Sequence, residues 1–357
     1  MAAIHQLVAG FSRGDAISNE ATVMRTVFRG WGFDSEIYCE RRRILPELRS
    51  EAMDLNELHA GCGPGDVALL HLSIGSQANE VFCGLPAKKA ILYHNITPPD
   101  YYQLVQPSTA TDLARGRKQA AALAGVATVN LADSAFNARE LTAWGYPPPA
   151  VLPLMLDLEK LGGAPDRAVM RQFGDGKVNV LFVGRCAPNK KIEDVLLAFA
   201  YFQKGVEANS RLILAGSYAG TERYHRLLIT MARDLKLENV VFTGSIPQAQ
   251  LNACYRSATL FLCMSEHEGF CIPLVESLVH RVPVLAFSAC AVPETLGGAG
   301  VLFHEKKFEA IAEMMGRITR DPALRASLLA NQDKRVLQLK ARNLERELRS
   351  HLAPLLP

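Results

Sequence analysis

The sequence lacks the patterns that would mark a metalloprotein, a membrane-spanning protein or a dedicated nucleic-acid binder. Its eight cysteines are scattered, without a C-x-x-C pair or paired histidines at the spacing of a zinc site. No apolar run approaches the ~20 residues that a transmembrane helix needs. The net charge of +3 is small, whereas a nucleic-acid-binding surface needs a strong basic excess. We therefore expect no metal site, no nucleic-acid partner and no membrane span.

The start of the chain and the cysteine usage favour the cytoplasm. The first residues contain no basic segment followed by an apolar stretch, so we expect no signal peptide. Several cysteines lie inside apolar runs, which is typical of small buried hydrophobic residues in a reducing compartment. One basic cluster, Arg41-Arg42-Arg43, is interpreted first as a solvated surface turn. The alternative is attraction to anionic lipid head groups, which would place the protein peripherally on the inner membrane face.

Motifs of several enzyme classes are also missing. The chain has no Walker A lysine motif, no serine nucleophile elbow and no Asp-x-Asp pair for a metal-bound diphosphate. The glycine-rich residues 61–65 precede an expected strand and contain Pro64. They are interpreted as a turn and not as a dinucleotide-binding fingerprint.

Strand-like apolar runs alternate with helical patterns along the whole chain, which predicts βαβ units and parallel sheets. A chain of 357 residues suits two domains. Glycine, proline and charge cluster at residues 158–165, where we expect the linker. We predict an N-terminal Rossmann-like domain over residues 1–160 and a C-terminal one over 166–332. A C-terminal helical segment, 333–357, with a charged helix at 333–351, would pack back on the N-terminal domain.

The individual elements follow from the apolar runs between turn-forming residues. Strands are expected at residues 4–8, 67–71, 89–93, 127–130, 151–153, 178–183, 211–215, 240–243, 259–263 and 284–287. Helices are expected at residues 19–29, 193–203, 221–235, 248–256 and 273–280. In the first helix, Val23, Val27 and Phe28 form the expected buried face. Ligands of such sheets bind outside the carboxyl ends of the strands, so the cleft between the domains is the expected site.

The segment after the expected strand 259–263 has the composition of an anion and sugar site. Gly269 allows close approach of a ligand, and Pro273 suits the first turn of a helix. A strand, a glycine-bearing loop and a helix N-terminus together present free N–H groups to an anion. Glu268 and Glu276 bracket the loop, and carboxylates accept hydrogen bonds from paired hydroxyls. Taken alone, Glu276 is also explained as an acid favoured by the helix dipole.

A second loop, residues 183–191, follows the expected strand 178–183 and precedes a helix. Arg185 and Lys190 stand five positions apart on it. An arginine fork and a mobile lysine can flank a diphosphate. Ordinary solvated cations on a surface loop are the alternative interpretation of this loop by itself.

Together the two loops resemble those of the retaining glycosyltransferases of family 4. That family carries a Glu-x7-Glu motif, matched by Glu268 and Glu276, and a Gly-Arg…Asn-Lys loop. The loop is matched by Gly184, Arg185, Asn189 and Lys190. Residues 214–216, which end in Gly216, and 241–244 are similar to its second-domain strand ends, and the resemblance covers about residues 178–330. It implies the GT-B architecture, in which two Rossmann-like domains with parallel sheets face each other across a cleft.

The resemblance also implies roles for single residues. Arg185 and Lys190 would hold the donor diphosphate and stabilise it as leaving group. Glu268 would bind donor-sugar hydroxyls with the backbone of Gly269 and Phe270 alongside, and Glu276 would bind the ribose. The remaining donor-binding residues that the resemblance implies are Gly184, Asn189, Gly216 and Cys271.

The first half matches the family more loosely. Gly14 lies in the loop where the family places a glycine near the donor diphosphate, but a Gly-Gly pair is replaced by Arg13-Gly14-Asp15. His94 ends the strand 89–93, where family members often have a sugar-contacting histidine. A core-edge histidine bonded to backbone is the alternative.

The expected function is retaining transfer of a hexose from a UDP-glucose- or GDP-mannose-type donor to a saccharide or lipid-linked saccharide. Such a hexosyltransferase acts in polysaccharide or glycoconjugate biosynthesis, with the nucleotide sugar as co-substrate and no bound cofactor. The alternatives are a sugar-nucleotide epimerase or a glycogen-phosphorylase-like enzyme on the same architecture, and a non-catalytic nucleotide-sugar-binding subunit. The pyridoxal lysine context of a phosphorylase is not found.

Overall fold

A computed structural model describes residues 2–357, apart from the side chains of residues 59 and 60, and divides the chain into two compact units. Unit 1 contains the chain as far as Asp100, Ser108–Leu156 and Asn343–Pro357. Unit 2 contains Tyr101–Pro107 and Asp157–Arg342. Each unit is therefore assembled from segments that are distant in the sequence.

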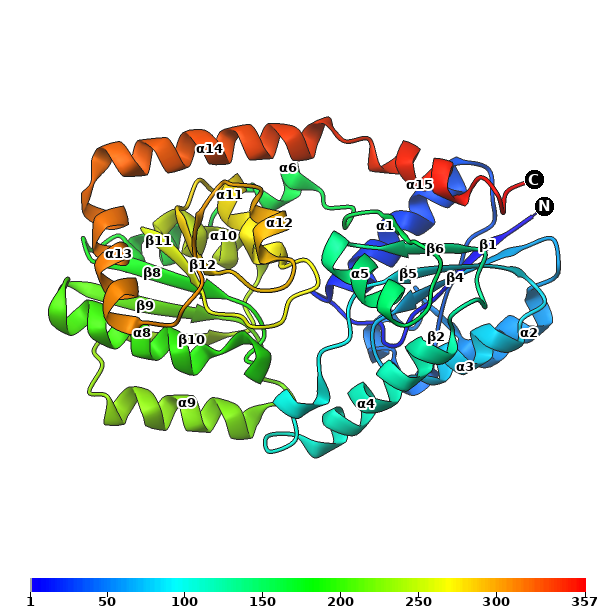
Figure 1. The fold of residues 1–357 in the computed structure, drawn as a ribbon, viewed down its shortest axis with the longest axis horizontal. Helices are drawn as coiled ribbons and strands as arrows, with labels where there is room; N and C mark the ends of the chain where they lie inside the picture. The colour runs from blue at the N-terminus through cyan, green and yellow to red at the C-terminus, as the bar shows by residue number, and fades with distance from the viewer. Residues whose placement is uncertain (1) are drawn as a thin grey trace. The chain divides into compact units, whose positions relative to one another are not determined.

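Unit 1 is a parallel seven-stranded sheet in the order β3-β2-β1-β4-β5-β6-β7 (Figure 1). Its strands are β1 (Ile4–Leu7), β2 (Ile37–Cys39), β3 (Met53–Asp54), β4 (Val67–Leu72), β5 (Lys88–Tyr93), β6 (Val129–Ala132) and β7 (Ala150–Val151). Its helices are α1 (Ala16–Gly30), α2 (Leu58–Gly61), α3 (Gln77–Gly84), α4 (Pro107–Ala122), α5 (Ala135–Ala143) and α15 (Leu344–Leu352). The strand order reverses direction between β1 and β4, which is where such sheets bind ligands.

Unit 2 is a parallel six-stranded sheet in the order β10-β9-β8-β11-β12-β13. Its strands are β8 (Val178–Val183), β9 (Ser210–Ala215), β10 (Val240–Gly244), β11 (Leu260–Cys263), β12 (Val284–Phe287) and β13 (Val301–Phe303). Its helices are α6 (Leu158–Leu161), α7 (Arg167–Phe173), α8 (Ile192–Gly205), α9 (Glu222–Asp234), α10 (Gln248–Ser257), α11 (Ile272–Val279), α12 (Val292–Leu296), α13 (Phe308–Arg320) and α14 (Pro322–Ala341).

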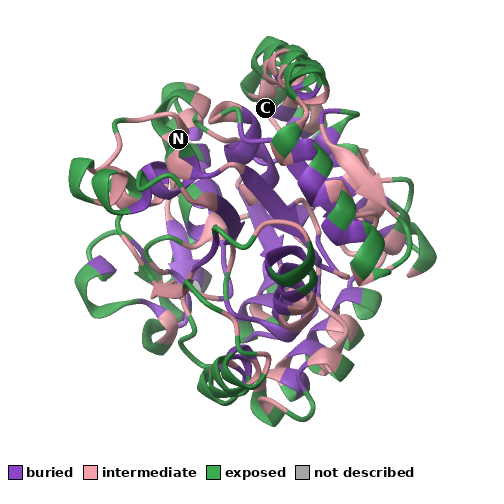
Figure 2. Ribbon diagram, turned by 90° about the vertical axis from the view of Figure 1, so that its left-hand side faces the viewer, coloured by how far each residue is buried: buried purple, intermediate pink, exposed green. Residues whose placement is uncertain are grey.

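Side chains that alternate along the strands of unit 2 build one core on each face of the sheet. Val180 and Phe182 of β8 pack with α8, α9 and α13, whereas Leu181 packs with α7, α10, α11 and α12. Figure 2 shows the result, with buried residues along the strands and exposed residues on the outer helix faces. Two parallel α/β units of this kind confirm the predicted fold class. Among the described residues, no helix has both the length and the apolar composition to cross a bilayer.

The first helix differs from the prediction in its start and in its buried face. It begins at Ala16, because the Asp15 carboxylate caps it by accepting from the Ser18 amide. Phe28 is buried as predicted, but Val23 is 38% exposed, and Glu20 is buried instead. Val27 also packs against the core, so the predicted face was wrong only at Val23. The polar contacts that accompany the burial of Glu20 are described below.

The C-terminal segment forms two helices and not one. α14 ends at Ala341, and the Asn343 side chain accepts from the Arg346 amide to start α15. The prediction of a continuous helix over residues 333–351 was wrong because this cap interrupts a uniformly charged pattern. In unit 1, α15 packs on the core through Leu348, and its Glu345 accepts from Trp31 Nε1 at 2.9 Å.

Leu348→Ala should lower the free energy of unfolding of unit 1 by about 2–5 kcal/mol, because Leu348 is fully buried against the core. Both tryptophans of the chain, Trp31 and Trp144, lie in unit 1, so tryptophan fluorescence during urea unfolding reports this unit. Leu337→Ala on α14 is the matched control, because Leu337 is 66% exposed and should change stability by less than ~0.5 kcal/mol. Equal effects of the two variants would contradict the packing of α15 on unit 1.

Candidate active site

Two loops at the carboxyl edge of the unit 2 sheet carry most of the predicted donor residues. One follows β8 and includes the 3-10 helix η5 (Pro188–Lys190); the other joins β11 to α11 over residues 264–271. Because β8 and β11 are paired strands, their loops meet at the same edge. Gly216 directly follows β9, and its backbone lies against Gly184 of the first loop. A Cβ at Gly216 would lie 1.9 Å from the Gly184 carbonyl oxygen, so only glycine fits there.

Asn189 and Lys190 tie these two loops together. The Asn189 side chain donates to the His267 backbone carbonyl at 3.0 Å, and the Asn189 backbone carbonyl accepts from the Glu266 amide at 2.9 Å. Lys190 Nζ lies 2.6 Å from each carboxylate oxygen of Glu268. The two side chains are only 19% and 7% exposed. Although burial disfavours the ammonium, the Glu268 carboxylate raises the pKa of Lys190 above its ordinary value, so the lysine keeps its proton.

The N-terminus of α11 completes this edge of unit 2. Cys271 is the N-cap residue and has a left-handed backbone, with φ at 72°. Within the described part of the chain, the amides of Gly269, Phe270 and Cys271 have no hydrogen-bond acceptor. Free amides at a helix N-terminus form an arrangement that attracts anions. The Cys271 thiol also bonds to Cys263, which lowers the pKa of the Cys263 thiol.

Glu276 lies on α11 and is as buried as Glu268. It is 7% exposed, and its Oε2 accepts from the Tyr255 hydroxyl at 2.7 Å. Burial raises the pKa of the Glu276 carboxyl above its ordinary value. Tyr255 therefore fixes the rotamer of Glu276 and leaves Oε1 for a further hydrogen bond.

An ion network that sequence reasoning missed flanks the same two loops. Lys306 Nζ lies 2.6 Å from both Asp194 Oδ2 and Glu266 Oε1. Tyr101 donates to Glu266 Oε2 at 3.2 Å. Tyr101 belongs to the Tyr101–Pro107 segment, which the first half of the sequence contributes to unit 2. The partners are 40 to 165 positions apart in the sequence, so no local pattern indicated them.

Arg185 and Gly14 lie outside these clusters. Arg185 is exposed at the start of the β8 loop and, among the described residues, is in no ion pair. Gly14 occupies an exposed turn of unit 1 with φ at 71° and open space around its Cα. The structure thus brings Asn189, Lys190 and Glu268 together and leaves Arg185 facing solvent.

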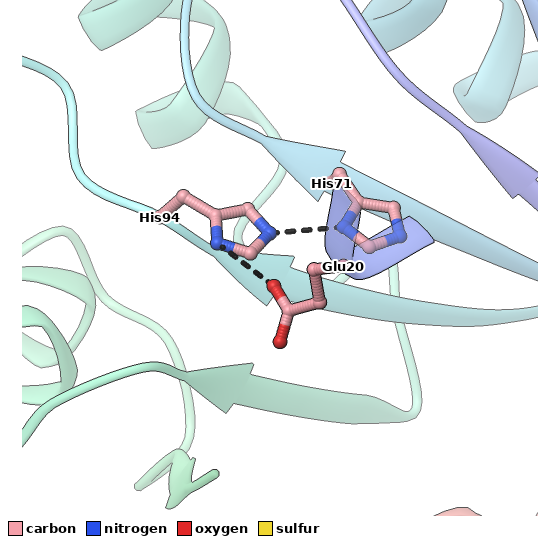
Figure 3. A group of neighbouring side chains, drawn as sticks. All are labelled: Glu20, His71 and His94. Atoms are coloured by element: carbon pink, nitrogen blue, oxygen red, sulfur yellow. Dashed lines mark hydrogen bonds and ion pairs between the residues drawn. The ribbon is translucent and has the colours of Figure 1, made fainter. Parts of the chain in front are cut away.

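In unit 1, His94 belongs to a buried polar cluster at the carboxyl edge of the sheet (Figure 3). We define the His94 cluster as Gln6, Glu20, His71, His94 and Asp133. His94 Nε2 lies 2.9 Å from His71 Nδ1, and His71 Nε2 lies 2.9 Å from Gln6 Oε1. His94 Nδ1 faces Glu20 Oε2 and Asp133 Oδ2, each at 3.6 Å. The His94 side chain is 3% exposed, so both ring nitrogens point into the cluster.

The hydrogen bonds fix where the protons of the His94 cluster lie. The Gln6 amide group donates to the Ala21 carbonyl, so its oxygen accepts from His71 Nε2–H. His71 then accepts at Nδ1 from His94, which leaves His94 Nδ1 between two carboxyl groups. Although burial opposes the cation, Asp133 and Glu20 raise the pKa of His94 above its ordinary value. Burial raises the pKa of Glu20 to about 7, against the charge of His94.

The sequence indicated His94 by its place at a strand end but gave no sign of its partners. Glu20 has the helical spacing of a surface residue, and His71 lies inside an apolar strand. Among the described residues, Glu20, His71 and His94 form one of two groups whose side chains are close enough together to hold a metal ion. Both ring nitrogens of His71 already have hydrogen-bond partners, His94 at Nδ1 and Gln6 at Nε2.

Part of unit 2 is similar to a described family of proteins. Residues 170–335 match the family "Glycosyl transferases group 1". The O-antigen chain mannosyltransferase B of Escherichia coli is 28% identical over 145 residues, which are 41% of this chain and 38% of that protein. A GDP-mannose-dependent alpha-mannosyltransferase of Mycolicibacterium smegmatis is 33% identical over 112 residues, or 31% and 26% of the two chains. The chain thus spans less than two fifths of the length of these relatives.

Solved structures show the same architecture along the whole chain. Sucrose-phosphate synthase from Thermosynechococcus elongatus superposes with a TM-score of 0.77 at 17% identity and covers 99% of both chains. Anabaena HepE in complex with UDP and glucose superposes with a TM-score of 0.73 at 16% identity, covering 99% of this chain and 100% of that one. At these identities the likeness concerns the fold, and it confirms the GT-B architecture.

The His94 cluster should make the stability of unit 1 fall as the pH rises. A carboxyl whose pKa is raised from 4.5 to about 7 on folding stabilises the native state fully below pH 4.5, and this contribution disappears as the pH rises through 7. The raised pKa values of His94 and Asp133 act in the same direction. Between pH 5 and pH 8.5 the Glu20 contribution should decrease by about 2–3 kcal/mol.

Urea unfolding followed by tryptophan fluorescence across this pH range measures the effect. Glu20→Gln should flatten the pH dependence, because a neutral amide cannot lose a proton. Glu80→Gln, which changes an exposed carboxylate of unit 1, should leave the slope unchanged. A Glu20→Gln slope equal to that of the unsubstituted protein would contradict this assignment.

Proposed function

We propose that this protein transfers a hexosyl group from a nucleoside-diphosphate sugar to a hydroxyl acceptor, with retention of configuration. The match of residues 170–335 to the group 1 glycosyl transferases and the GT-B fold support the proposal. The observation that carries the proposal is the Lys190–Glu268 pair beside the N-terminus of α11. A nucleotide sugar has an anionic half, which suits a cation and free amides, and a hydroxyl-bearing half, which suits a carboxylate.

Donor binding would give Lys190 and Glu268 new partners in place of each other. The diphosphate offers Lys190 a new anion, and the sugar hydroxyls offer Glu268 new donors, so neither buried charge is left unpaired. Arg185 is exposed on the same loop as Lys190 and can close on the diphosphate as a second cation. Glu276, held by Tyr255, would bind the ribose through its remaining oxygen.

The transfer step needs stabilisation of the charge on the departing phosphate oxygen. Lys190, Arg185 and the α11 N-terminus would supply it as the bond from the anomeric carbon to that oxygen breaks. The acceptor hydroxyl would form the new bond on the same face, and its proton would pass to the departing phosphate. A direct contact of His94 with the sugar would require its ring to give up the bond to His71, because both ring nitrogens face the His94 cluster.

GDP-mannose is the donor that we propose to test first, with UDP-glucose second. The sequence relatives of unit 2 include mannosyltransferases, one of which is named as GDP-mannose-dependent. UDP-glucose comes second because HepE, which has the same fold, has been solved in complex with UDP and glucose. We propose a saccharide or lipid-linked saccharide as acceptor, as in polysaccharide biosynthesis.

Lys190→Gln should lower the rate of transfer by about 100- to 1,000-fold, the effect of removing one donor that stabilises a developing oxyanion. Glutamine is preferred to alanine because its amide can still donate to the buried Glu268. The measurement is release of nucleoside diphosphate from the donor in the presence of acceptor.

The matched control is Arg211→Gln, which breaks the Arg211–Asp175 pair at the amino edge of the same sheet, where the two closest atoms are 2.6 Å apart. This variant should lose stability but keep its transfer rate. Unchanged transfer by Lys190→Gln would refute the assignment. Donor binding without turnover in the unsubstituted protein would instead favour a non-catalytic binding subunit.

A panel of GDP, UDP, ADP and their sugars should identify the base by thermal shift. A ligand at 100 times its dissociation constant stabilises the native state by about 2.7 kcal/mol. We expect this shift for GDP or UDP with the unsubstituted protein and a smaller one with Lys190→Gln. The absence of a shift with every nucleotide would contradict the proposal.

A further inference from the structure

We propose that Cys263, Glu268 and Cys271 form a binding site for a thiophilic divalent cation of the Zn²⁺ class, and that the bound ion competes with Lys190 for Glu268. The three side chains each offer one ligand atom, and these atoms all lie within 4.8 Å of one another. All three residues are buried. Sequence analysis excluded a zinc site because the cysteines lack the usual C-x-x-C spacing, so this proposal reverses that expectation.

The fold brings together two proposed metal ligands, Cys263 and Cys271, that are eight positions apart in the sequence. Cys263 is the last residue of β11, and Cys271 is the N-cap residue of α11, so the loop between them returns to its starting point. The left-handed backbone conformation of Cys271 turns the chain back toward Cys263. Glu268 projects from the same loop. A rigid strand end and a helix N-terminus therefore hold the two sulfurs close to each other and to the Glu268 carboxylate.

The ligand set suits a soft or borderline cation. Thiolates select Zn²⁺ and heavier ions of its group, whereas Mg²⁺ and Ca²⁺ prefer oxygen ligands. With Zn–S bonds of about 2.3 Å, two sulfurs of a tetrahedral site are about 3.8 Å apart. The observed limit of 4.8 Å is therefore within about 1 Å of that geometry. The Ser265 hydroxyl, 3.5 Å from Cys263 Sγ, would support the sulfur from outside the ligand set.

Charge also favours an ion in this position. Lys190 Nζ, 2.6 Å from both Glu268 oxygens, shows that the cluster already holds one cation, supplied by the protein itself. A divalent ion would enter as both thiols release their protons, and Lys190 would turn away while staying near the site. The buried cluster, with its lysine, would then be neutral before and after the exchange. The fourth coordination position would be open on the side that Lys190 leaves.

The consequence for transfer rests on the proposed function. A metal-bound Glu268 cannot accept hydrogen bonds from the donor sugar, so the ion should inhibit transfer in competition with the donor. The metal site itself does not depend on that function, because it can be detected by its thiolate spectrum.

The experiment is a Cd²⁺ titration of the full chain, kept reduced with a phosphine and carrying Cys83→Ser to remove an exposed thiol. Thiolate-to-cadmium absorption in the ultraviolet should saturate at one ion per chain. Cys263→Ser should weaken binding by more than about 100-fold, since loss of an outer partner alone costs 10- to 100-fold. Cys254→Ser, which changes another buried cysteine of unit 2, should bind like the parent.

Zn²⁺ should raise the apparent KM for the donor in the parent but not in Cys263→Ser, which is expected to keep its basal transfer rate. Equal Cd²⁺ spectra for Cys263→Ser and Cys254→Ser, or no thiolate band at all, would overturn the site. Binding that Cys263→Ser abolishes, without any inhibition by Zn²⁺, would overturn the competition with the donor. A thiolate band in a protein that transfers no sugar would count against the proposed function and leave the metal site supported.

Discussion

The Lys190–Glu268 ion pair is the interaction on which the unit 2 site depends. Burying a single carboxylate or ammonium costs several kcal/mol, so each of these side chains can be withdrawn from solvent only because the other is present. Their pairing also holds together the loops after β8 and β11. Asn189 adds two hydrogen bonds between the same loops, one to the His267 carbonyl and one from the Glu266 amide. Without a ligand, each of these two buried charges is therefore paired with the other. A ligand that separates them must provide a new partner for each.

This requirement selects the chemistry of the ligand. A neutral sugar would leave Lys190 without an anion, and a free phosphate would leave Glu268 without a donor. The proposed donor, a nucleotide sugar, would satisfy both at once, because one bond joins its diphosphate to the sugar ring that carries the hydroxyls. Unit 1 solves the same problem differently. In the His94 cluster no lysine is present, and the buried carboxyl groups of Glu20 and Asp133 share protons with an imidazole.

Sequence reasoning reached the parts of the site that depend on local pattern. Lys190 and Glu268 were predicted because their loops each follow a recognisable buried strand and precede a helix, and because the two loops together resemble those of the family 4 glycosyltransferases. Glu20 was missed because a glutamate at a helical position is normally solvated, and only contacts with His94 and the Met155 amide explain its burial. Tyr101 was missed for a related reason, since its partner Glu266 is 165 positions away.

The backbone of Cys271 connects local strain with the chemistry of the site. A left-handed conformation costs a residue with a Cβ about 1 kcal/mol or more relative to glycine. The side chain that causes this cost must be stabilised by what it touches, and here it meets the Cys263 thiol and the Lys190–Glu268 pair. An alanine at position 271 would carry the same backbone strain but would lack the contact with the Cys263 sulfur. The left-handed backbone of Cys271 therefore determines both the geometry of the α11 N-terminus and the position of the Cys271 sulfur beside Cys263 and Glu268.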